Sequence, residues 1–442
     1  MSTFLKGTIV LILVAFIGEC IEFLLNMVLA KELGEVGMGL YMTILPSIFL
    51  VVILASLELP ISVSKLIAEH EQKYHRHMLQ HIMKITIIMT TIFLLLSVLI
   101  LPYVSVFDDY HPYVRWLVVA LIPLISFTSI ARGYFMGVQK MGKIAFSNFL
   151  RKAIQLILLV FIFQMFDLNL DYAILIALST LVISDIFVFG YLIYEYIVRV
   201  RFLNRQPKEK VSKRTVSKQL MSVSIPTTGL RIFHSVTHAI QPFLIKAALI
   251  RAGMPAAVAT EHYGLLAGVA LTIGFFPAFI AHSLLIVLIP TVSEAYAKGD
   301  LTKLQHLLQK VLRFTMLYGV PAIAVFYFFA EPLTHLFFES TAATIYLQML
   351  WPYFLFHFFV IPMQAYLIGL GLLKDAFFHT VWSHVIAFLV MFILGSLQQL
   401  RMEGIIIGMN MGAVLLTLMH YVTICKKIGL TVFLKIPIKT YN

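Results

Sequence analysis

The most distinctive polar residues of this 442-residue sequence lie in a segment, residues 220–246, that is otherwise apolar. Its polar side chains recur at spacings of three and four, which places them on one face of a helix. The members of this stripe are Ser224, Thr227, Thr228, Arg231, His234, Ser235, His238 and Gln241. A helix surrounded by lipid would not tolerate the stripe, so it must face other helices or a water-filled cavity. Ionisable residues at that depth are costly and therefore indicate a functional site.

Three further polar residues share one face of an earlier apolar segment. Glu19, Glu22 and Asn26 are spaced i, i+3 and i+7. Glu19 and Arg231 each lie 13 residues after a flanking lysine. With a helical rise of about 1.5 Å per residue, both lie about 20 Å along their helices. We therefore hypothesise that one of the two glutamates pairs with Arg231 or His238 in one conformation. A static pair that fixes helix packing is the alternative.

A third carboxylate, Asp185, lies in the middle of the apolar segment 173–198. Such a group can carry a proton or hold a cation, and it can equally serve packing through hydrogen bonds. We assign the two first-span glutamates and Asp185 to coupling or gating. By contrast, Glu58 and Lys65 flank the inner end of another apolar segment, and we expect both at the membrane surface.

Membrane-spanning helices must position these residues. Hydrophobic residues make up 60% of the chain and charged residues 12%, and the mean hydropathy is +0.94. A soluble protein of this length could not bury so much apolar surface, so the bilayer is the solvent for most of the chain. Runs of about 20 apolar residues predict twelve spans. They lie at 7–30, 40–64, 82–103, 114–137, 148–166, 173–198, 220–246, 263–291, 314–330, 345–371, 377–398 and 404–425.

The basic residues predict the orientation of these spans. If the N-terminus is cytoplasmic, 27 of the 33 Lys and Arg residues fall on the inner side and five on the outer side, with Arg231 inside a span. This asymmetry follows the positive-inside rule and places both termini in the cytoplasm. The net charge of +12 therefore reflects short cytoplasmic loops, and we expect no nucleic-acid partner.

The longest polar stretch, Arg199–Lys218, divides the spans into six and six. We expect an N-terminal lobe at 1–200, a basic cytoplasmic linker at 201–219 and a C-terminal lobe at 220–442. Matched residues recur 230 to 232 positions apart: Pro46 with Pro277, Pro60 with Pro290, Tyr134 with Tyr366, and Gly137 with Gly369. Two repeats of six spans share one orientation, which is the layout of rocker-type transporters with the substrate between the halves.

Signals for enzymatic chemistry are sparse. The sequence has no nucleotide-binding loop and no metal-binding motif. Its two cysteines, Cys20 and Cys425, form no metal or redox spacing. No loop between the expected spans is long enough for a soluble catalytic domain. We therefore expect no enzymatic activity, no metal and no cofactor.

Four segments carry a resemblance to a known family. They are LGEVGMGLYMTILPSIFLVVILASLELPISVSKLIAEHE (33–71), RGYFMGVQKMGKIAFSNFLRK (132–152), SIPTTGLRIFHSVTHAIQPFLI (224–245) and YGLLAGVALTIGFFPAFIAHSLLIVLIPTVSEAYA (263–297). In order and spacing they resemble stage V sporulation protein B and its relatives. These belong to the multidrug/oligosaccharidyl-lipid/polysaccharide (MOP) exporter superfamily, in its lipid flippase branch.

The resemblance implies an all-α fold of two pseudo-symmetric six-helix lobes around a central cleft. It also implies a flippase that moves a polyprenyl-pyrophosphate-linked saccharide, such as a peptidoglycan precursor, from the inner to the outer leaflet during sporulation. The expected location is the plasma membrane of a spore-forming bacterium, with the mother-cell and forespore membranes as candidates. The expected partners are the lipid-linked saccharide, membrane lipids, and protons or Na⁺, bound by a monomer. We expect the substrate to contact Arg231, His234, His238, Gln241 and Asn26.

The chain departs from the family pattern in two respects. Relatives often have fourteen helices, so a lipid-tail groove formed by the extra pair is in doubt here. Relatives tend to carry a basic residue on the first helix, where this chain has Glu19 and Asn26. A cleft with an acidic residue on one wall and a basic residue on the other binds a doubly charged anion less readily than a cleft with basic residues on both walls. A cation-coupled exporter of small amphipathic or cationic molecules is therefore the alternative, and a non-transporting sporulation membrane protein is a further one.

Overall fold

The structure is a computed structural model that describes residues 3–203, 212–338 and 340–430. These ranges are helical apart from short connections and contain no strand. Residues 204–211 of the expected linker at 201–219 lie outside the described residues.

Helices follow one another along the chain with short connections. The first six are α1 (Thr3–Ser56), α2 (Leu59–Ala68), α3 (Gln72–Ile100), α4 (Tyr113–Gly137), α5 (Met141–Met165) and α6 (Leu170–Leu203). The others are α7 (Lys213–Arg251), α8 (Ala256–Gly264), α9 (Leu271–Phe275), α10 (Ala278–Ala297), α11 (Leu301–Phe328), α12 (Ala330–Thr334), α13 (Thr341–Met349), α14 (Trp351–Gly369), α15 (Leu373–Gly395) and α16 (Met402–Lys427). Two 3-10 turns, Leu101–Tyr103 and Ser105–Phe107, follow α3, and a π-helical turn, Leu265–Ala270, joins α8 to α9.

Within the described residues, 11 helical segments are long and apolar enough to cross a membrane. They relate to the twelve expected spans with three differences. The first two spans are merged, because α1 bends at Gly34 (φ 68°) without a loop. The eighth span is divided at Pro277, between α9 and α10. The helix that carries the polar stripe, α7, is not among the 11.

The chain forms two compact units. The first, residues 32–240, is called here the N-terminal unit; the second, residues 1–31 with 241–442, is called the C-terminal unit. These bounds differ from the lobes expected at 1–200 and 220–442. The start of α1 belongs with the later helices, and most of α7 belongs with the earlier ones. The lobe boundaries expected from the internal repeat stay a prediction.

Small residues let the helices of the N-terminal unit pack closely. Its core is formed by α2, α3, α4, α6 and the start of α7. A Cβ atom added at Gly133 of α4 would lie 2.7 Å from Cβ of Val63, and one at Gly137 would lie 2.7 Å from Cβ of Ile67. Glycines at this spacing are typical of helix contacts in membranes, and here they join α4 to α2.

The C-terminal unit repeats this contact. Its core is formed mainly by α10, α11, α14 and α16. A Cβ atom added at Gly369 of α14 would lie 2.7 Å from Cβ of Val292 on α10. The matched Tyr-x-x-Gly segments of the two halves thus make corresponding contacts, α4 with α2 and α14 with α10. A second seam, Gly404, Gly408 and Gly412 of α16, packs against α15.

Candidate functional site

The helix of the second expected span is interrupted at Leu57 and Glu58, called here the α1–α2 break. Both residues have left-handed backbone conformations, with φ of 46° and 48°. This conformation costs a non-glycine residue roughly 1–2 kcal/mol. Pro60 follows in the first turn of α2, where a missing N–H is tolerated. From α4, the Ser126 hydroxyl lies 2.9 Å from the carbonyl oxygen of Ala55. Such strain persists only where the surroundings hold it, and it is often found at functional sites.

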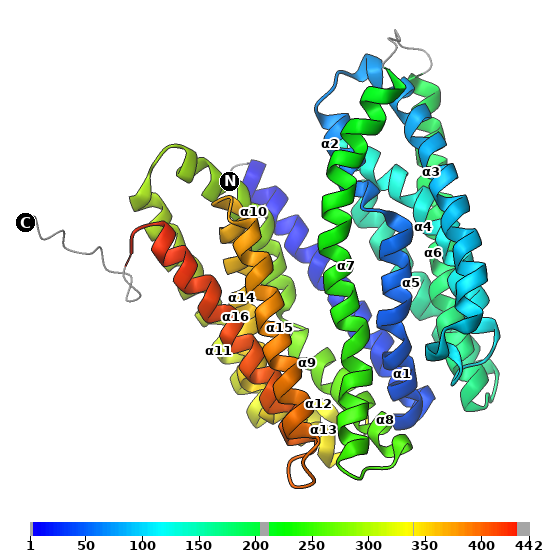
Figure 1. The fold of residues 1–442 in the computed structure, drawn as a ribbon, viewed down its shortest axis with the longest axis vertical. Coiled ribbons are helices and arrows are strands. Elements are labelled where there is room, and N and C mark those ends of the chain that lie inside the picture. The colour runs from blue at the N-terminus through cyan, green and yellow to red at the C-terminus, as the bar shows by residue number, and fades with distance from the viewer. Residues whose placement is uncertain (1–2, 204–211, 339, 431–442) are drawn as a thin grey trace, which may run out of the picture. The chain divides into compact units, whose positions relative to one another are not determined.

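Two polar groups of α7 hold the α1–α2 break. The Ser224 hydroxyl donates a hydrogen bond to the carbonyl oxygen of Leu57. Seven residues later, Nη1 of Arg231 donates to Oε1 of Glu58 at 2.8 Å. Figure 1 shows α7 running alongside the second part of α1, which leads into the break. The polar stripe predicted on this helix thus meets the strained backbone of its neighbour.

The two charges of this pair differ in exposure. The Glu58 side chain is 2% exposed, and the Arg231 side chain is 56% exposed. A buried carboxylate without a partner is strongly destabilising, so Arg231 compensates the charge of Glu58. A guanidinium has five N–H donors, and its exposed part can bind a further acceptor. Glu58, which we expected at the membrane surface, is thus buried by neighbouring helices, whereas Lys65 is exposed. The depth of both residues in the membrane stays a prediction.

The remaining stripe residues extend along α7 on either side of Arg231. Ser235 and Thr228 are buried, His234 is half-buried against the ring of Phe233, and His238 is exposed. Gln241 is half-buried and is the first residue of α7 that belongs to the C-terminal unit. Two exposed basic side chains, Arg231 and His238, therefore lie two turns apart on this helix.

Asp185 lies in a separate cluster of the N-terminal unit. It is 5% exposed on α6. The guanidinium groups of Arg151 on α5 and Arg132 on α4 interact electrostatically with its carboxylate. Two positive charges around one negative charge leave an excess of positive charge. This cluster does not suit the binding of a cationic substrate at Asp185.

The acidic residues of the first expected span lie in the C-terminal unit. Glu19 and Glu22 are half-buried on α1, and Asn26 is 8% exposed. Arg231 belongs to the other unit, where it is paired with Glu58. The hypothesised pairing of a first-span glutamate with Arg231 or His238 stays a prediction.

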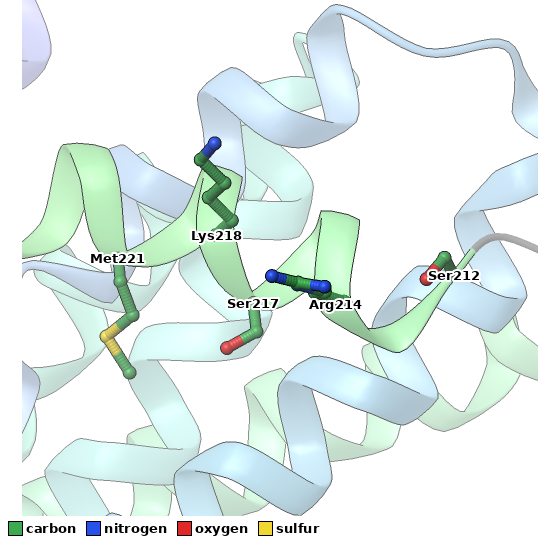
Figure 2. A pocket seen from close by; sticks show the side chains of 5 residues that line it. All are labelled: Ser212, Arg214, Ser217, Lys218 and Met221. Atoms are coloured by element: carbon green, nitrogen blue, oxygen red, sulfur yellow. The ribbon is translucent and has the colours of Figure 1, made fainter.

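A basic pocket lies at the start of α7, before Ser224. It has a volume of about 710 Å³. Figure 2 shows the side chains that line it: Ser212, Arg214, Ser217, Lys218 and Met221. A neighbouring pocket shares Arg214 and Lys218 and adds the amide of Gln219 and the hydroxyl of Ser222. Cations and hydroxyl donors around an open space suit an anionic group such as a phosphate.

Sequence reasoning identified Arg231 and missed Glu58. The segment LELP could have indicated Glu58, because it places this carboxylate directly before a Leu-Pro pair inside an apolar run. A carboxylate in such a run needs a partner. The sequence does not show that the partner is Arg231, because 173 positions separate the two residues.

Comparisons with known proteins agree with this architecture. A family model described as polysaccharide biosynthesis protein matches residues 4–296, and a second, described as MatE, matches residues 265–393. The sporulation protein YkvU of Bacillus subtilis (strain 168) is 54% identical over 434 residues, which cover 98% of each chain. Stage V sporulation protein B of the same organism is 30% identical over 98% of this chain and 86% of its own length. Its lipid II flippase MurJ is 23% identical over 77% of this chain and 66% of its own length.

A solved structure shares the fold. It is the inward-facing conformation of a multidrug resistance MATE family transporter of the MOP superfamily, which superposes with a TM-score of 0.72 at 16% sequence identity. The superposition covers 93% of this chain and 94% of that transporter. The all-helical, two-lobe fold expected from the sequence is thereby confirmed.

Proposed function

The chain belongs to the polysaccharide biosynthesis protein family of the MOP superfamily, and from this membership we propose that it flips a polyprenyl-pyrophosphate-linked saccharide. The substrate is a precursor of peptidoglycan or of another polysaccharide, and it moves from the inner to the outer leaflet by alternating access. One relative is a lipid II flippase, which supports the flipping of a lipid. Because that relative is a flippase, we propose that this chain also has no enzymatic activity.

One observation carries this proposal: the guanidinium of Arg231 pairs with the buried carboxylate of Glu58 and is itself about half exposed. One N–H donor is used by Glu58 at 2.8 Å, and 56% of the side chain is exposed. Guanidinium groups bind phosphate oxygens with two parallel hydrogen bonds. We place a phosphate of the pyrophosphate at this exposed part, with His234 and His238 of the same helix as further substrate contacts. The contacts expected at Gln241 and Asn26 stay predictions from the sequence.

The pairing with Glu58 gives this site a means of conformational control. A phosphate that draws the guanidinium away from Glu58 leaves a buried carboxylate unpaired and removes one of the two contacts that α7 makes with the α1–α2 break. The strained conformations of Leu57 and Glu58 are then free to relax, which alters the packing of α7 on its neighbours. Substrate binding is thereby coupled to the helix movement that alternating access requires.

The basic pocket at the start of α7 provides a first contact for the headgroup. Its cations, Arg214 and Lys218, lie on the same helix as Arg231, and Lys218 precedes Arg231 by 13 residues, or about 20 Å. Attraction between an anionic headgroup and this pocket would raise the local substrate concentration.

We assign coupling, by protons or Na⁺, to the carboxylates Glu19 and Glu22, and gating to Asp185, because its two arginine neighbours disfavour a bound cation. The rival function, a cation-coupled exporter of cationic molecules, draws support from the two half-buried glutamates of the first span. The two arginines that act on Asp185 favour an anionic substrate over that rival.

The proposed location is the plasma membrane of a bacterium, with both termini in the cytoplasm. The Lys and Arg distribution supports this orientation. Two relatives are sporulation proteins of Bacillus subtilis, and we extend a sporulation role, in the mother-cell or forespore membrane, to this chain. We propose that a monomer carries out the transport.

The anion site can be tested by ligand stabilisation of the purified protein. Farnesyl pyrophosphate is the probe, and farnesol, which lacks the pyrophosphate, is the matched control. A ligand at one hundred times its Kd stabilises a protein by about 2.7 kcal/mol. We expect stabilisation by the pyrophosphate in wild type and in Arg251→Ala, which removes a positive charge at the far end of α7, and its loss in Arg231→Ala. Equal effects of farnesol, or an unchanged effect in Arg231→Ala, would overturn the proposal.

A further inference from the structure

Two buried histidines of the C-terminal unit face each other across a helix contact. His379 on α15 and His420 on α16 are 9% and 0% exposed, and their Nδ1 atoms lie 3.0 Å apart. The Thr423 hydroxyl lies 3.2 Å from Nε2 of His379. The two helices run side by side (Figure 1) and are in close contact along the glycine seam of α16. The imidazoles are therefore held together by the packing of their helices.

The short Nδ1–Nδ1 distance fixes the protonation of the pair. One Nδ1 must carry a hydrogen and the other must present a lone pair, because two lone pairs or two N–H groups cannot form this bond. Nε2 of His420 is buried and has no hydrogen-bond partner in the described part of the chain. Nε2 of His379 faces a hydroxyl that can donate or accept. His379 can therefore gain a proton and still keep both of its hydrogen bonds, one with His420 and one with Thr423.

We propose that the His379–His420 pair is a proton-binding site that takes up one proton on His379. In the proton-loaded state, Nδ1 of His379 donates to Nδ1 of His420, and its Nε2 donates to the Thr423 hydroxyl. A charge-assisted hydrogen bond is about twice as strong as a neutral one, so the added proton strengthens the contact between the rings. A second proton would replace the lone pair of His420 and separate the rings, which limits the site to one.

Opposing influences act on a positive charge at His379. Burial of the ring opposes the charge, and Asp375, one turn earlier on α15, favours it electrostatically. Lys374, Lys426 and Lys427, at the near ends of α15 and α16, are positively charged and oppose it. Three further titratable groups of α14, α15 and α16 make contacts of their own. Nδ1 of His384 lies 2.8 Å from the Thr380 carbonyl oxygen, the Tyr366 hydroxyl of α14 donates to the Leu304 carbonyl, and Tyr421 interacts with Cys425 on its own helix.

The pair lies near one end of the two helices. His379 lies six residues after Leu373, where α15 begins, and His420 lies seven residues before Lys427, where α16 ends. Both rings are therefore about 10 Å from this end. Lys374, Lys426 and Lys427 gather there, and it is the end that we propose to be cytoplasmic.

Histidine ¹⁵N NMR of the full-length protein in bilayers tests the proposal. Acidification from about pH 8 to about pH 5, the range in which histidine usually titrates, should produce one imidazolium from the pair. This signal should be absent in His379→Asn and retained in His420→Asn, because an asparagine oxygen can replace the acceptor Nδ1. Asp375→Asn should weaken the proton affinity roughly tenfold. Thr423→Val, which keeps the shape of the side chain, should weaken it as well.

Two results would overturn the proposal: both rings staying neutral throughout this range in wild type, or an unchanged titration in His379→Asn and Thr423→Val. Any role of this proton in transport would rest on the proposed flippase function. The NMR measurement is independent of that function, because it reports protonation whether or not any lipid is flipped.

Discussion

Glu58 is buried within the N-terminal unit with its charge compensated by Arg231, and the two residues form the centre of the candidate site. Arg231 can be found from the sequence because it interrupts an apolar helix within a regular polar stripe. Glu58 cannot be assigned in this way, because the helix break that buries it depends on backbone conformations that no local motif reveals. Leu57 and Glu58 are not glycines, yet both adopt left-handed conformations.

Arg231→Ala should destabilise the protein, because it leaves the buried carboxylate of Glu58 without its partner. A buried partner left unsatisfied costs about 1–3 kcal/mol. Glu58→Gln removes the charge, so the double variant Arg231→Ala/Glu58→Gln should recover part of the loss. Thermal unfolding of the purified protein in detergent, arranged as a double-mutant cycle, measures the interaction. Strictly additive losses would show that the pair contributes no coupling.

At the scale of the helices, glycines decide which elements can approach. The matched glycines of α4 and α14 were visible in the sequence as part of an internal repeat, and both lie at close helix contacts. The seam of α16 was not recognised, because glycines are common in membrane helices and their contacts depend on which helix lies opposite. In the structure, Gly408 faces the backbone of Met391 on α15.

Gly408→Ala should therefore force α15 and α16 apart. The added Cβ would lie 2.4 Å from Cγ and 2.7 Å from the backbone N of Met391. Overpacking of this kind costs about 1–3 kcal/mol. Gly190→Ala on α6 is the matched control, because its Cβ would meet nothing within 4 Å. We expect the melting temperature to fall in Gly408→Ala and to stay unchanged in Gly190→Ala. Equal melting temperatures would show that the seam can relax.

At the scale of the whole molecule, hydropathy predicted an all-helical membrane protein, and the structure confirms it. The number of spans was harder to predict. The bend of α1 at Gly34 joins two expected spans, and the interruption at Pro277 divides another. The boundaries of the two units could not be predicted from the sequence either. They depend on which helices pack together, and not on where the polar linker lies. The start of α1 packs through Phe16 and Phe23 onto Phe276 of the C-terminal unit.

The orientation of the chain can be tested with single cysteines. Asp109→Cys, between α3 and α4, and Thr302→Cys, in the first turn of α11, introduce thiols at exposed positions. The Lys and Arg distribution places these two positions on opposite sides of the membrane. The background replaces Cys20 and Cys425 with alanine. An impermeant maleimide added to intact cells should label position 109 and leave position 302 unlabelled until the membrane is opened. The reverse pattern would invert the proposed topology.

Leaflet exchange in proteoliposomes tests the central claim most directly. A fluorescent polyprenyl-pyrophosphate saccharide is reconstituted with purified protein, and its transfer between leaflets is followed by protection from a quencher. Wild type and Arg251→Ala should exchange the lipid faster than protein-free vesicles, and Arg231→Ala should fall to the rate of those vesicles. Folded wild-type protein that gives no exchange above empty vesicles, or an Arg231→Ala variant as fast as wild type, would contradict the account.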